Sequence, residues 1–295
     1  MADTARKWTD EELARMEDEI RNIYSESKRG ITQKWNAYMK RSQRHLDALY
    51  DNIETKEDLE RYQRELMDFT IHRDKYMSMI QETTRRIANA NQIAINYANG
   101  KMPSIYEVNY NQAANDAANI GIRFNIINED VIRRRIVEGD IKLPNKTLDI
   151  PKDMRWNTKQ LNASVVQGII QGESMDDIAK RIYPIVDKNQ AAAIRNARTM
   201  VTGAENAGRH DSYKSLEESG VILEKVWIAA HDGRTRDWHA SMDGQAVGNE
   251  EAFIDGNGNE LMYPGDPDAD PETVYNCRCS MSARIMGFIP RSKRG

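Results

Sequence analysis

Apolar residues recur every three or four positions through most of the chain, which is the period of an amphipathic helix. The run from Thr9 to Glu12 has the form of a capping box, so a first helix is predicted to begin there. Its apolar stripe indicates one long helix, or a helix broken near Gly30. A second stripe predicts a helix over residues 55–99, and Pro103 is suited to open a third. These helices are expected to form an antiparallel arm.

Two proline-containing breaks, at Pro144 and Pro151, mark the predicted end of this arm. More helix is predicted over residues 157–171 and 174–182, and Asp187 is suited to cap a further alanine-rich helix. The polar side of that last helix carries Arg195, Arg198, Glu205, Asn206 and Arg209. Taken alone, this row is interpreted as a solvated helix face with ordinary ion pairs.

After Gly220 the apolar period changes to two, which predicts a strand over residues 221–230. A turn then follows from His231 to Thr235, and a short helix over 236–240. A glycine- and asparagine-rich turn at 255–259 lies between two short apolar runs, which is typical of a hairpin. Residues 273–281 are expected to be extended.

The predicted fold class is therefore α+β, with a long N-terminal helical arm and helical middle followed by a small C-terminal α+β domain. The predicted domains are a helical arm at 1–150, a helical connector at 151–219, a compact α+β domain at 220–285 and a basic tail at 286–295. A chain of 295 residues is long enough for two or three domains with a buried core.

Composition and charge narrow the function classes. The chain is 39% hydrophobic and 30% charged, with a mean hydropathy of −0.76, as expected for long solvated helices. No apolar run approaches the roughly 18 residues of a membrane span, and the N-terminus does not resemble a signal peptide, so we expect synthesis in the cytoplasm and no membrane partner. Residues 221–285 carry 5 Lys and Arg against 12 Asp and Glu, a net charge of −7 that disfavours DNA binding there.

The chemistry of the C-terminal domain centres on its two cysteines. Cys277 and Cys279 are the only cysteines of the chain and are two residues apart, so on a strand they share a face. Such a pair is poorly placed for a mutual disulfide but can bind a soft metal. Zinc is the candidate cofactor, with His239 as the first choice for a third ligand and His231 or Asp232 as the second. The alternative is that both cysteines are small core residues.

Catalysis is the minority interpretation of the same residues. A zinc deaminase would need a Cys-x-x-Cys motif, which the sequence lacks. A cysteine hydrolase built on Cys277 with His239, or a nuclease using His239, Arg234 and Asp243, is chemically conceivable, but no set has the spacing of a known catalytic motif. No catalytic residue is therefore assigned.

The order of motifs resembles the phage head morphogenesis family of the Mu F-like type, the minor head proteins. The matching residues are Arg198-Thr199, Asn206, Arg209, Tyr213, Lys225-Val226-Trp227, Asp232-Gly233-Arg234-Thr235-Arg236-Asp237-Trp238-His239, Asp243-Gly244-Gln245, Phe253, Pro264-Gly265-Asp266-Pro267 and Asn276-Cys277-Arg278-Cys279. The combination of D-x-R-T-R-x-x-H with a later N-C-R-C is more specific than either part. Acidic residues often follow the Arg-Thr pair in this family, whereas here Met200-Val201-Thr202 intervene before Glu205, which leaves a role for that acid open.

The resemblance implies a structural protein of a tailed-phage virion, located in the capsid interior near the portal vertex. It implies binding to the portal protein, with the major capsid or scaffold protein as further partners, and a part in head morphogenesis or in DNA packaging or delivery. Packaged DNA is a partner that the basic tail could contact. The alternative is an enzymatic domain, a nuclease or a nucleotide-using transferase, carried in the virion.

The motif residues are expected to have structural roles. Asp232, Arg234 and Arg236 are predicted to order the turn, and His239 is predicted to join it to the two cysteines. The remaining motif positions with an expected structural role are Arg198, Asn206, Asp243 and Asn276.

Overall fold

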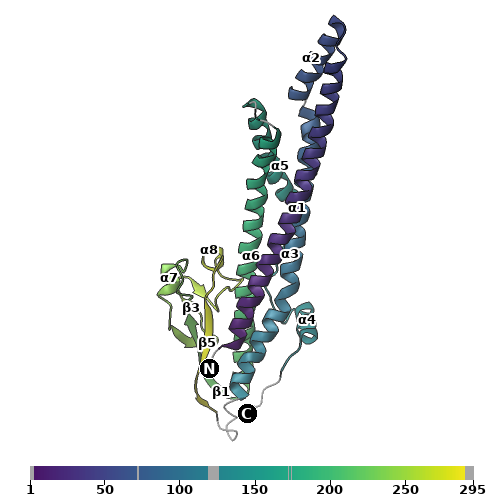
Figure 1. Cartoon of the computed structure of the whole chain (residues 1–295). Helices are drawn as coiled ribbons and strands as arrows, with labels where there is room; N and C mark the ends of the chain where they lie inside the picture. The colour runs from purple at the N-terminus through teal and green to yellow at the C-terminus, as the bar shows by residue number, and fades with distance from the viewer. Residues whose placement is uncertain (1–2, 72, 119–125, 172, 174, 290–295) are drawn as a thin grey trace. The chain divides into compact units, whose positions relative to one another are not determined.

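The computed structural model describes residues 3–71, 73–118, 126–171, 173 and 175–289 (Figure 1). The helices are α1 (Thr4–Asp51), α2 (Lys56–Ile71), α3 (Arg73–Ala118), α4 (Glu129–Glu138), α5 (Ile150–Ile170), α6 (Met175–Glu218), α7 (Asp237–Ala240) and α8 (Pro271–Val274). The strands are β1 (Val221–Ile228), β2 (Ala246–Gly248), β3 (Phe253–Ile254), β4 (Glu260–Leu261) and β5 (Ser280–Phe288). The predicted α+β class is confirmed. Ser174 and the basic tail from residue 290 lie outside the described residues.

The chain divides into two compact units. The first unit comprises Met1–Asp18, Ile95–Lys146 and Ile194–Gly295, and the second comprises Glu19–Ala94 and Thr147–Ala193. The division passes through α1, α3 and α6, so each of these helices contributes to both units. These two units do not test where one domain ends and the next begins. The predicted domain boundaries at 150, 219 and 285 therefore stay a prediction.

The first helix begins earlier than predicted. α1 starts at Thr4, where the Asp3 carboxylate accepts a hydrogen bond from the Arg6 amide at 2.9 Å, as an N-cap does. Thr9 lies inside the helix, is buried, and accepts a hydrogen bond from Asn109 Nδ2 at 2.9 Å. Glu12 is also buried and pairs with a lysine of α3. The capping-box prediction was wrong because these side chains serve tertiary contacts.

Two predicted helix breaks are also wrong. α3 continues through Gly100 and Pro103, and α6 continues through Pro184 and past Asp187, which pairs with Lys28 Nζ at 3.2 Å and caps no helix. A proline removes one backbone donor from a helix, a cost that tertiary packing can outweigh. α1 also runs unbroken past Gly30.

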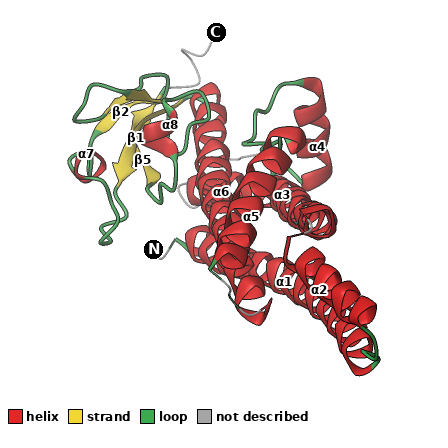
Figure 2. Ribbon diagram, turned by 90° about the horizontal axis from the view of Figure 1, so that it is seen from above, coloured by secondary structure: helices red, strands yellow, loops and turns green. Residues whose placement is uncertain are grey.

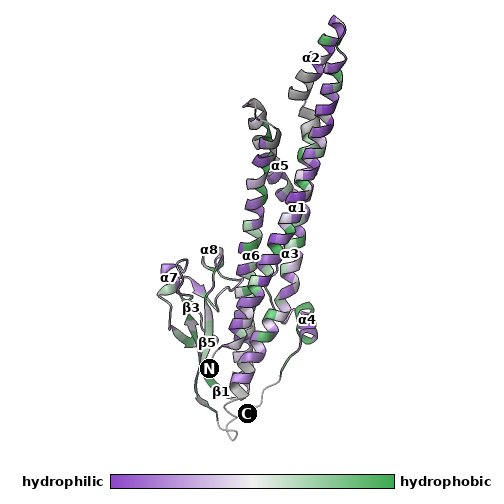
Figure 3. Ribbon diagram, in the orientation of Figure 1, coloured by the Kyte–Doolittle hydropathy of each residue, from purple (hydrophilic) through white to green (hydrophobic). Residues whose placement is uncertain are grey.

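Apolar residues from α1, α3, α5 and α6 form the core of the second unit. Its buried large side chains include Ile20, Tyr24, Ile31, Trp35, Ile80, Ile87, Leu161, Val165, Ile178 and Ile182. Hydrophobic and hydrophilic positions are interspersed along α1, α3 and α6, as expected when one face of a helix is apolar (Figure 3). No helix among the described residues is both long enough and apolar enough to cross a membrane.

A group of polar side chains is buried within the second unit. Tyr24 Oη donates to Asn91 Oδ1 at 2.6 Å, and Asn91 Nδ2 donates to Asp153 Oδ2 at 2.7 Å and to Asn189 Oδ1 at 2.9 Å. Asn189 Nδ2 in turn donates to Asn157 Oδ1 at 2.9 Å. Side chains from α1, α3, α5 and α6 therefore meet in one hydrogen-bonded group, which we call the helical amide network.

The strands of the first unit form an antiparallel sheet of order β2-β1-β5 (Figure 2). The central strand β1 pairs with β5 from Ile228 opposite Ser280 to Val221 opposite Phe288, with one register shift after Ile222. β3 and β4 form the predicted hairpin. The segment expected to be extended over 273–281 instead begins within α8 and becomes a strand only at Ser280. The sheet core includes Leu223, Trp227, Met242, Phe253, Leu261, Cys277, Cys279 and Met281.

Candidate functional site

A row of polar side chains on α6 binds the backbone of the cysteine segment, which is defined here as residues 276–281. The row consists of Thr199, Thr202, Asn206 and Arg209, spaced by three or four residues on one helix face. We call it the α6 polar row. Thr199 Oγ1 accepts from the Asn276 amide at 2.8 Å, and Thr202 Oγ1 donates to the Cys277 carbonyl at 2.7 Å.

Asn206 lies at the centre of this contact and is fully buried. Its Nδ2 donates to the Cys279 carbonyl at 3.3 Å, and its Oδ1 accepts from the Met281 amide at 3.1 Å. Arg209 then donates to the Met281 carbonyl at 3.2 Å. Buried backbone groups must be paired, and here helix side chains supply the partners that a neighbouring strand would otherwise give. The interpretation of this helix face as solvated was wrong.

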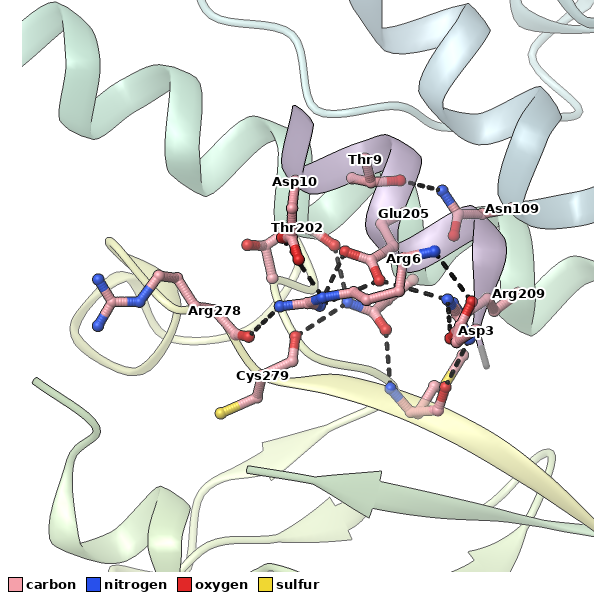
Figure 4. A network of polar contacts seen from close by, with 12 residues as sticks. Asp3, Arg6, Thr9, Asp10, Asn109, Thr202, Glu205, Arg209, Arg278 and Cys279 are labelled. Atoms are coloured by element: carbon pink, nitrogen blue, oxygen red, sulfur yellow. Dashed lines mark hydrogen bonds and ion pairs between the residues drawn. The ribbon is translucent and has the colours of Figure 1, made fainter. Parts of the chain in front are cut away.

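A charged group extends the same contact to the N-terminal residues (Figure 4). Arg6 donates to both carboxylate oxygens of Glu205 at 3.0 Å, and to the Arg278 carbonyl at 2.9 Å. Arg209 donates to Asp3 at 2.6 Å and lies 3.5 Å from Glu205. Burial raises the pKa of Glu205, while the charges of Arg6 and Arg209 act in the opposite direction. Glu205 is thus a buried acid held between two guanidinium groups.

Arg198 belongs to the same helix and has its own partner. Its guanidinium donates to the two carboxylate oxygens of Glu17 at 2.6 and 3.0 Å. Both side chains are largely shielded from solvent, with exposed fractions of 21% and 12%. This two-point pairing suits a planar guanidinium and a carboxylate.

The turn between β1 and α7 is ordered by Asp232. Its Oδ1 accepts from the Arg234 amide at 3.0 Å, from the Thr235 hydroxyl at 3.2 Å and from the Arg278 guanidinium at 2.6 Å. Burial alone would raise the pKa of Asp232, but the hydrogen bond from Arg234 and the charge of Arg278 hold this pKa below its ordinary value. Arg236 donates to the Tyr275 carbonyl at 2.6 Å. Asp232 and Arg236 therefore both connect the turn to the stretch around the cysteines.

Asp243 and His231 form a separate pair beside this turn. Asp243 Oδ1 accepts from the Ala229 amide at 2.9 Å, and Oδ2 lies 2.9 Å from His231 Nε2. The amide hydrogen bond and the His231 contact lower the pKa of Asp243. His231 is 61% exposed. Of the four residues predicted to bind a metal, His231 is thus the one that the structure pairs elsewhere.

The other three predicted metal-binding residues come together. The ligand atoms of His239, Cys277 and Cys279 all lie within 4.8 Å of one another, and the three side chains are buried. His239 Nδ1 is 3.6 Å from Cys277 Sγ and 3.8 Å from Cys279 Sγ. The His239 ring also packs edge-on against Trp227, with centroids 5.4 Å apart. We call this group the His-Cys-Cys cluster; such a donor set can bind a soft metal ion.

The two thiols of the cluster differ in acidity. The hydrogen bond between them raises the pKa of the Cys277 thiol, and burial adds to this increase. The same hydrogen bond lowers the pKa of the Cys279 thiol, with a smaller contribution from His239. The pair therefore favours a thiolate at Cys279.

Asn276 places the cysteine segment. Its φ of 57° lies in the left-handed region, which asparagine adopts more readily than most residues. Its side-chain Oδ1 is buried and has no hydrogen-bond partner among the described residues. The residue thus contributes through its backbone, which turns the chain and binds Thr199.

Lys225 is part of the Lys225-Val226-Trp227 motif, and the structure gives it a role. It is fully buried on β1, where its Nζ donates to the Met262 carbonyl at 2.8 Å and lies 5.2 Å from the centroid of the Phe253 ring. Burial lowers the pKa of Lys225 to about 8. A buried lysine of this kind joins β1 to the loop after β4.

Comparison with known families bears directly on this region. Residues 159–282 match the family described as Phage Mu protein F like protein. This segment is similar to the Mu F-like family. It contains the α6 polar row, the sheet strands β1 to β4 and the His-Cys-Cys cluster, so the resemblance inferred from the motifs is confirmed.

Three curated proteins are similar to the chain. The minor head protein GP7 of Bacillus phage SPP1 is 31% identical over 175 residues, which cover 58% of this chain and 54% of that protein. An uncharacterized protein of Bacillus subtilis (strain 168) is 29% identical over 169 residues, 51% of this chain and 54% of that protein. An NAD(+)–arginine ADP-ribosyltransferase of Enterococcus faecalis (strain ATCC 700802 / V583) is 25% identical over 176 residues, 60% of this chain and 36% of that protein. The chain thus spans about half or less of each relative, and no solved structure matches it significantly.

Sequence reasoning missed the N-terminal contribution to this region. Asp3 and Arg6 belong to no recognised motif, and Arg6 precedes its partner Glu205 by 199 positions. The available signal was the acid and the arginine one helical turn apart on α6, Glu205 and Arg209, flanked by alanine and glycine positions that bury that face. That pattern indicates buried charges in need of partners.

Proposed function

We propose that this chain is a structural minor head protein of a tailed phage. The observation that carries the proposal is the Mu F-like match over residues 159–282, supported by the similarity to a phage minor head protein. The polar contacts in that segment mostly join side chains to backbone groups, and such contacts stabilise a small domain. A virion location follows from this role.

The finer parts of the role are also proposed. The chain binds the portal protein from the capsid interior and assists head morphogenesis or the packaging and delivery of DNA, with the major capsid or scaffold protein as further partners. The solvated faces of the long helices supply polar surface for such partners. The basic tail, with Arg291, Lys293 and Arg294, is the proposed contact with packaged DNA.

The role requires no catalytic centre, so we propose that the chain is not an enzyme. Within it, the His-Cys-Cys cluster has a structural task, for which zinc is the proposed cofactor. One relative is named as an ADP-ribosyltransferase, and this motivates a second candidate, an enzymatic domain carried in the virion. The match covers only 36% of that relative, so the structural role is preferred.

Copurification tests the main proposal. The chain is co-expressed with the portal protein of the same phage genome, and a tag on the portal protein is used for capture. We expect the chain to be captured in a fixed ratio and to be detected in purified virions with an antibody. Absence from both the portal complex and the virion would overturn the structural role.

Two further assays test the alternative and the tail. Incubation with labelled NAD and a host lysate, or with plasmid DNA, is expected to give no labelled protein and no cleavage; label transfer or cleavage that purifies with the chain would support the enzyme. DNA binding by the wild type is expected to weaken as the salt concentration rises. Replacement of Arg291, Lys293 and Arg294 by alanine is expected to remove most of this DNA binding. Unchanged binding in that variant would contradict the proposed role of the tail.

A further inference from the structure

The His-Cys-Cys cluster has the spacing of a tetrahedral metal site. One nitrogen, His239 Nδ1, faces both sulfurs, at 3.6 Å from Cys277 Sγ and 3.8 Å from Cys279 Sγ. Zn–S bonds of about 2.3 Å and Zn–N bonds of about 2.0 Å in tetrahedral geometry separate neighbouring ligand atoms by roughly 3.5–3.8 Å. One nitrogen that faces two sulfurs at these distances fits an ion shared by all three atoms.

We propose that His239 Nδ1 and the sulfurs of Cys277 and Cys279 bind one zinc ion, with a solvent molecule as the fourth ligand. Thiolate and imidazole are the donors that zinc prefers in proteins. The assignment rests on the geometry of the cluster and does not depend on a role in the phage head. The ion joins the turn at α7 to the cysteine segment, 38 residues later in the chain.

The surrounding backbone holds the sulfurs in place. The Cys279 amide donates to Cys277 Sγ at 3.4 Å, a contact that shares the charge of a metal-bound thiolate. On the other side of the segment, the α6 polar row binds the carbonyls of both cysteines through Thr202 and Asn206. Both sulfurs are therefore fixed before an ion binds.

The third ligand is positioned by α7. The amide of His239 donates to the Arg236 carbonyl at 3.0 Å in the turn of this short helix, and the ring packs against Trp227. The second ring nitrogen, Nε2, is buried and has no hydrogen-bond partner among the described residues. Binding of the ion at Nδ1 leaves the proton on Nε2 and sets the tautomer of the ring.

Among the residues that the structure describes, no fourth His, Cys, Asp or Glu side chain joins the cluster. Among the described residues, the His, Cys, Asp and Glu groups that converge on this point are His239, Cys277 and Cys279. His231, the other predicted ligand, pairs with Asp243 at 2.9 Å and is mostly exposed. Asp232 is bound to the Arg278 guanidinium. The coordination is thus Cys₂His plus one exchangeable ligand.

Metal analysis of the intact chain tests the proposal directly. The protein is purified without added metal, and zinc is measured by mass spectrometry. We expect about one zinc per chain, removal by a strong chelator with a fall in Tm, and recovery of that Tm when zinc alone is added back. A wild type that holds no zinc and takes up none on addition would overturn the site, and this comparison needs no variant.

Variants and cobalt test the ligand set. Cys277→Ser, Cys279→Ser and His239→Ala are each expected to lower the zinc content at least about tenfold, whereas the matched control His231→Ala keeps it. Cobalt in place of zinc is expected to give the visible bands of a tetrahedral ion and a sulfur-to-cobalt charge-transfer band. Loss of zinc in His231→Ala, or a cobalt spectrum without the sulfur band, would overturn the assignment. A chain that binds the portal protein but no zinc would overturn only the zinc proposal. A chain that binds zinc but not the portal protein would overturn only the proposed head role.

Discussion

The two compact units bury polar side chains in different ways. In the second unit, the helical amide network joins four helices through amides, a phenol and one carboxylate. In the first unit, the α6 polar row binds the backbone of the cysteine segment, and charged groups surround it. The first arrangement relates helices to one another, while the second supports the cysteine segment, of which residues 276–279 lie between α8 and β5.

The difference follows from where backbone hydrogen bonds go. A helix pairs its own backbone groups, so side chains buried between helices need only pair with each other. Residues 276–279 lie between α8 and β5, where the Cys277 amide donates to the Val274 carbonyl at 3.1 Å. The Asn276 amide and the carbonyls of Cys277 and Cys279 depend on side chains from α6, so changes there should affect local backbone order as well as stability.

The largest effect is expected for the buried acid of the first unit. Glu205→Ala leaves the guanidinium groups of Arg6 and Arg209 facing each other, and removal of one partner from a buried ion pair costs about 3–5 kcal/mol of unfolding free energy. Urea denaturation followed by tryptophan fluorescence measures the change. The control is Glu11→Ala, an exposed acid paired with Lys7 on the same helix as Arg6, where little change is expected. Equal stability of the two variants would contradict the ranking.

Asn206→Ala should separate the two kinds of polar burial. It removes the partners of the Cys279 carbonyl and the Met281 amide, which costs about 1–3 kcal/mol. Hydrogen exchange should become faster across the cysteine segment. Asn189→Ala, in the helical amide network, is the matched control: a similar loss of stability is expected without faster exchange in the backbone around it, because Asn189 bonds mainly to other side chains. If hydrogen exchange around the mutated residue became faster to the same extent in both variants, the proposed difference between the two kinds of polar burial would be contradicted.

The sequence predicts the elements of the molecule better than it predicts these contacts. The periods of 3.6 and 2 identify the helical part, β1 and the β3–β4 hairpin, because burial of one face is a local property. The predicted breaks at Gly100, Pro103 and Asp187 failed because packing carried α3 and α6 through residues that disfavour or start helices.

The candidate site divides in the same way. The pairing of His239 with the two cysteines could be proposed because few residues of the chain can bind a soft metal. The contacts of Asn206 with Cys279 and of Arg6 with Glu205 join positions 73 and 199 apart, and local patterns do not specify contacts across such distances. His231 is a second-choice ligand by sequence, whereas the structure pairs it with Asp243.

Gly203 on α6 tests how closely this helix approaches its neighbours, and Gly100 on α3 is the control. A Cβ on Gly203 would lie 2.7 Å from the Gly265 carbonyl oxygen and 2.6 Å from Pro144 Cγ, so Gly203→Ala is expected to cost about 1–3 kcal/mol. Gly100 lies within α3 and has no such neighbour within 4 Å. Gly100→Ala should therefore stabilise the chain by roughly 0.5–1 kcal/mol. Thermal unfolding measures both, and a shift of the same sign would contradict the close packing of α6 on the loop after β4.

The smallest effect expected is a difference in response to acid. Asp232 and Asp243 in the first unit have lowered pKa values, so their stabilising contribution is complete above the unfolded pKa of about 3.9 and is lost as the pH falls through the folded values. Burial raises the pKa of Asp153 in the helical amide network, against hydrogen bonds from Asn91 and Asn157. Its contribution has the opposite sign: the folded state holds this proton more tightly, so acid favours folding at that site.

Acid below about pH 3.9 should therefore loosen the sheet domain of the first unit before the helices of the second. Solvent screening of Asp243 keeps its contribution below about 1 kcal/mol, so the comparison is best made within one protein. Hydrogen exchange, corrected for the intrinsic rate at each pH, is compared at pH 7 and at about pH 3, below the unfolded pKa, in peptides from the two units. Asp243→Asn should reduce the pH dependence around β1 and the turn, and Asp153→Asn should leave it unchanged there. Equal loss of protection in both units would show that the charged contacts of the first unit do not set its response to acid.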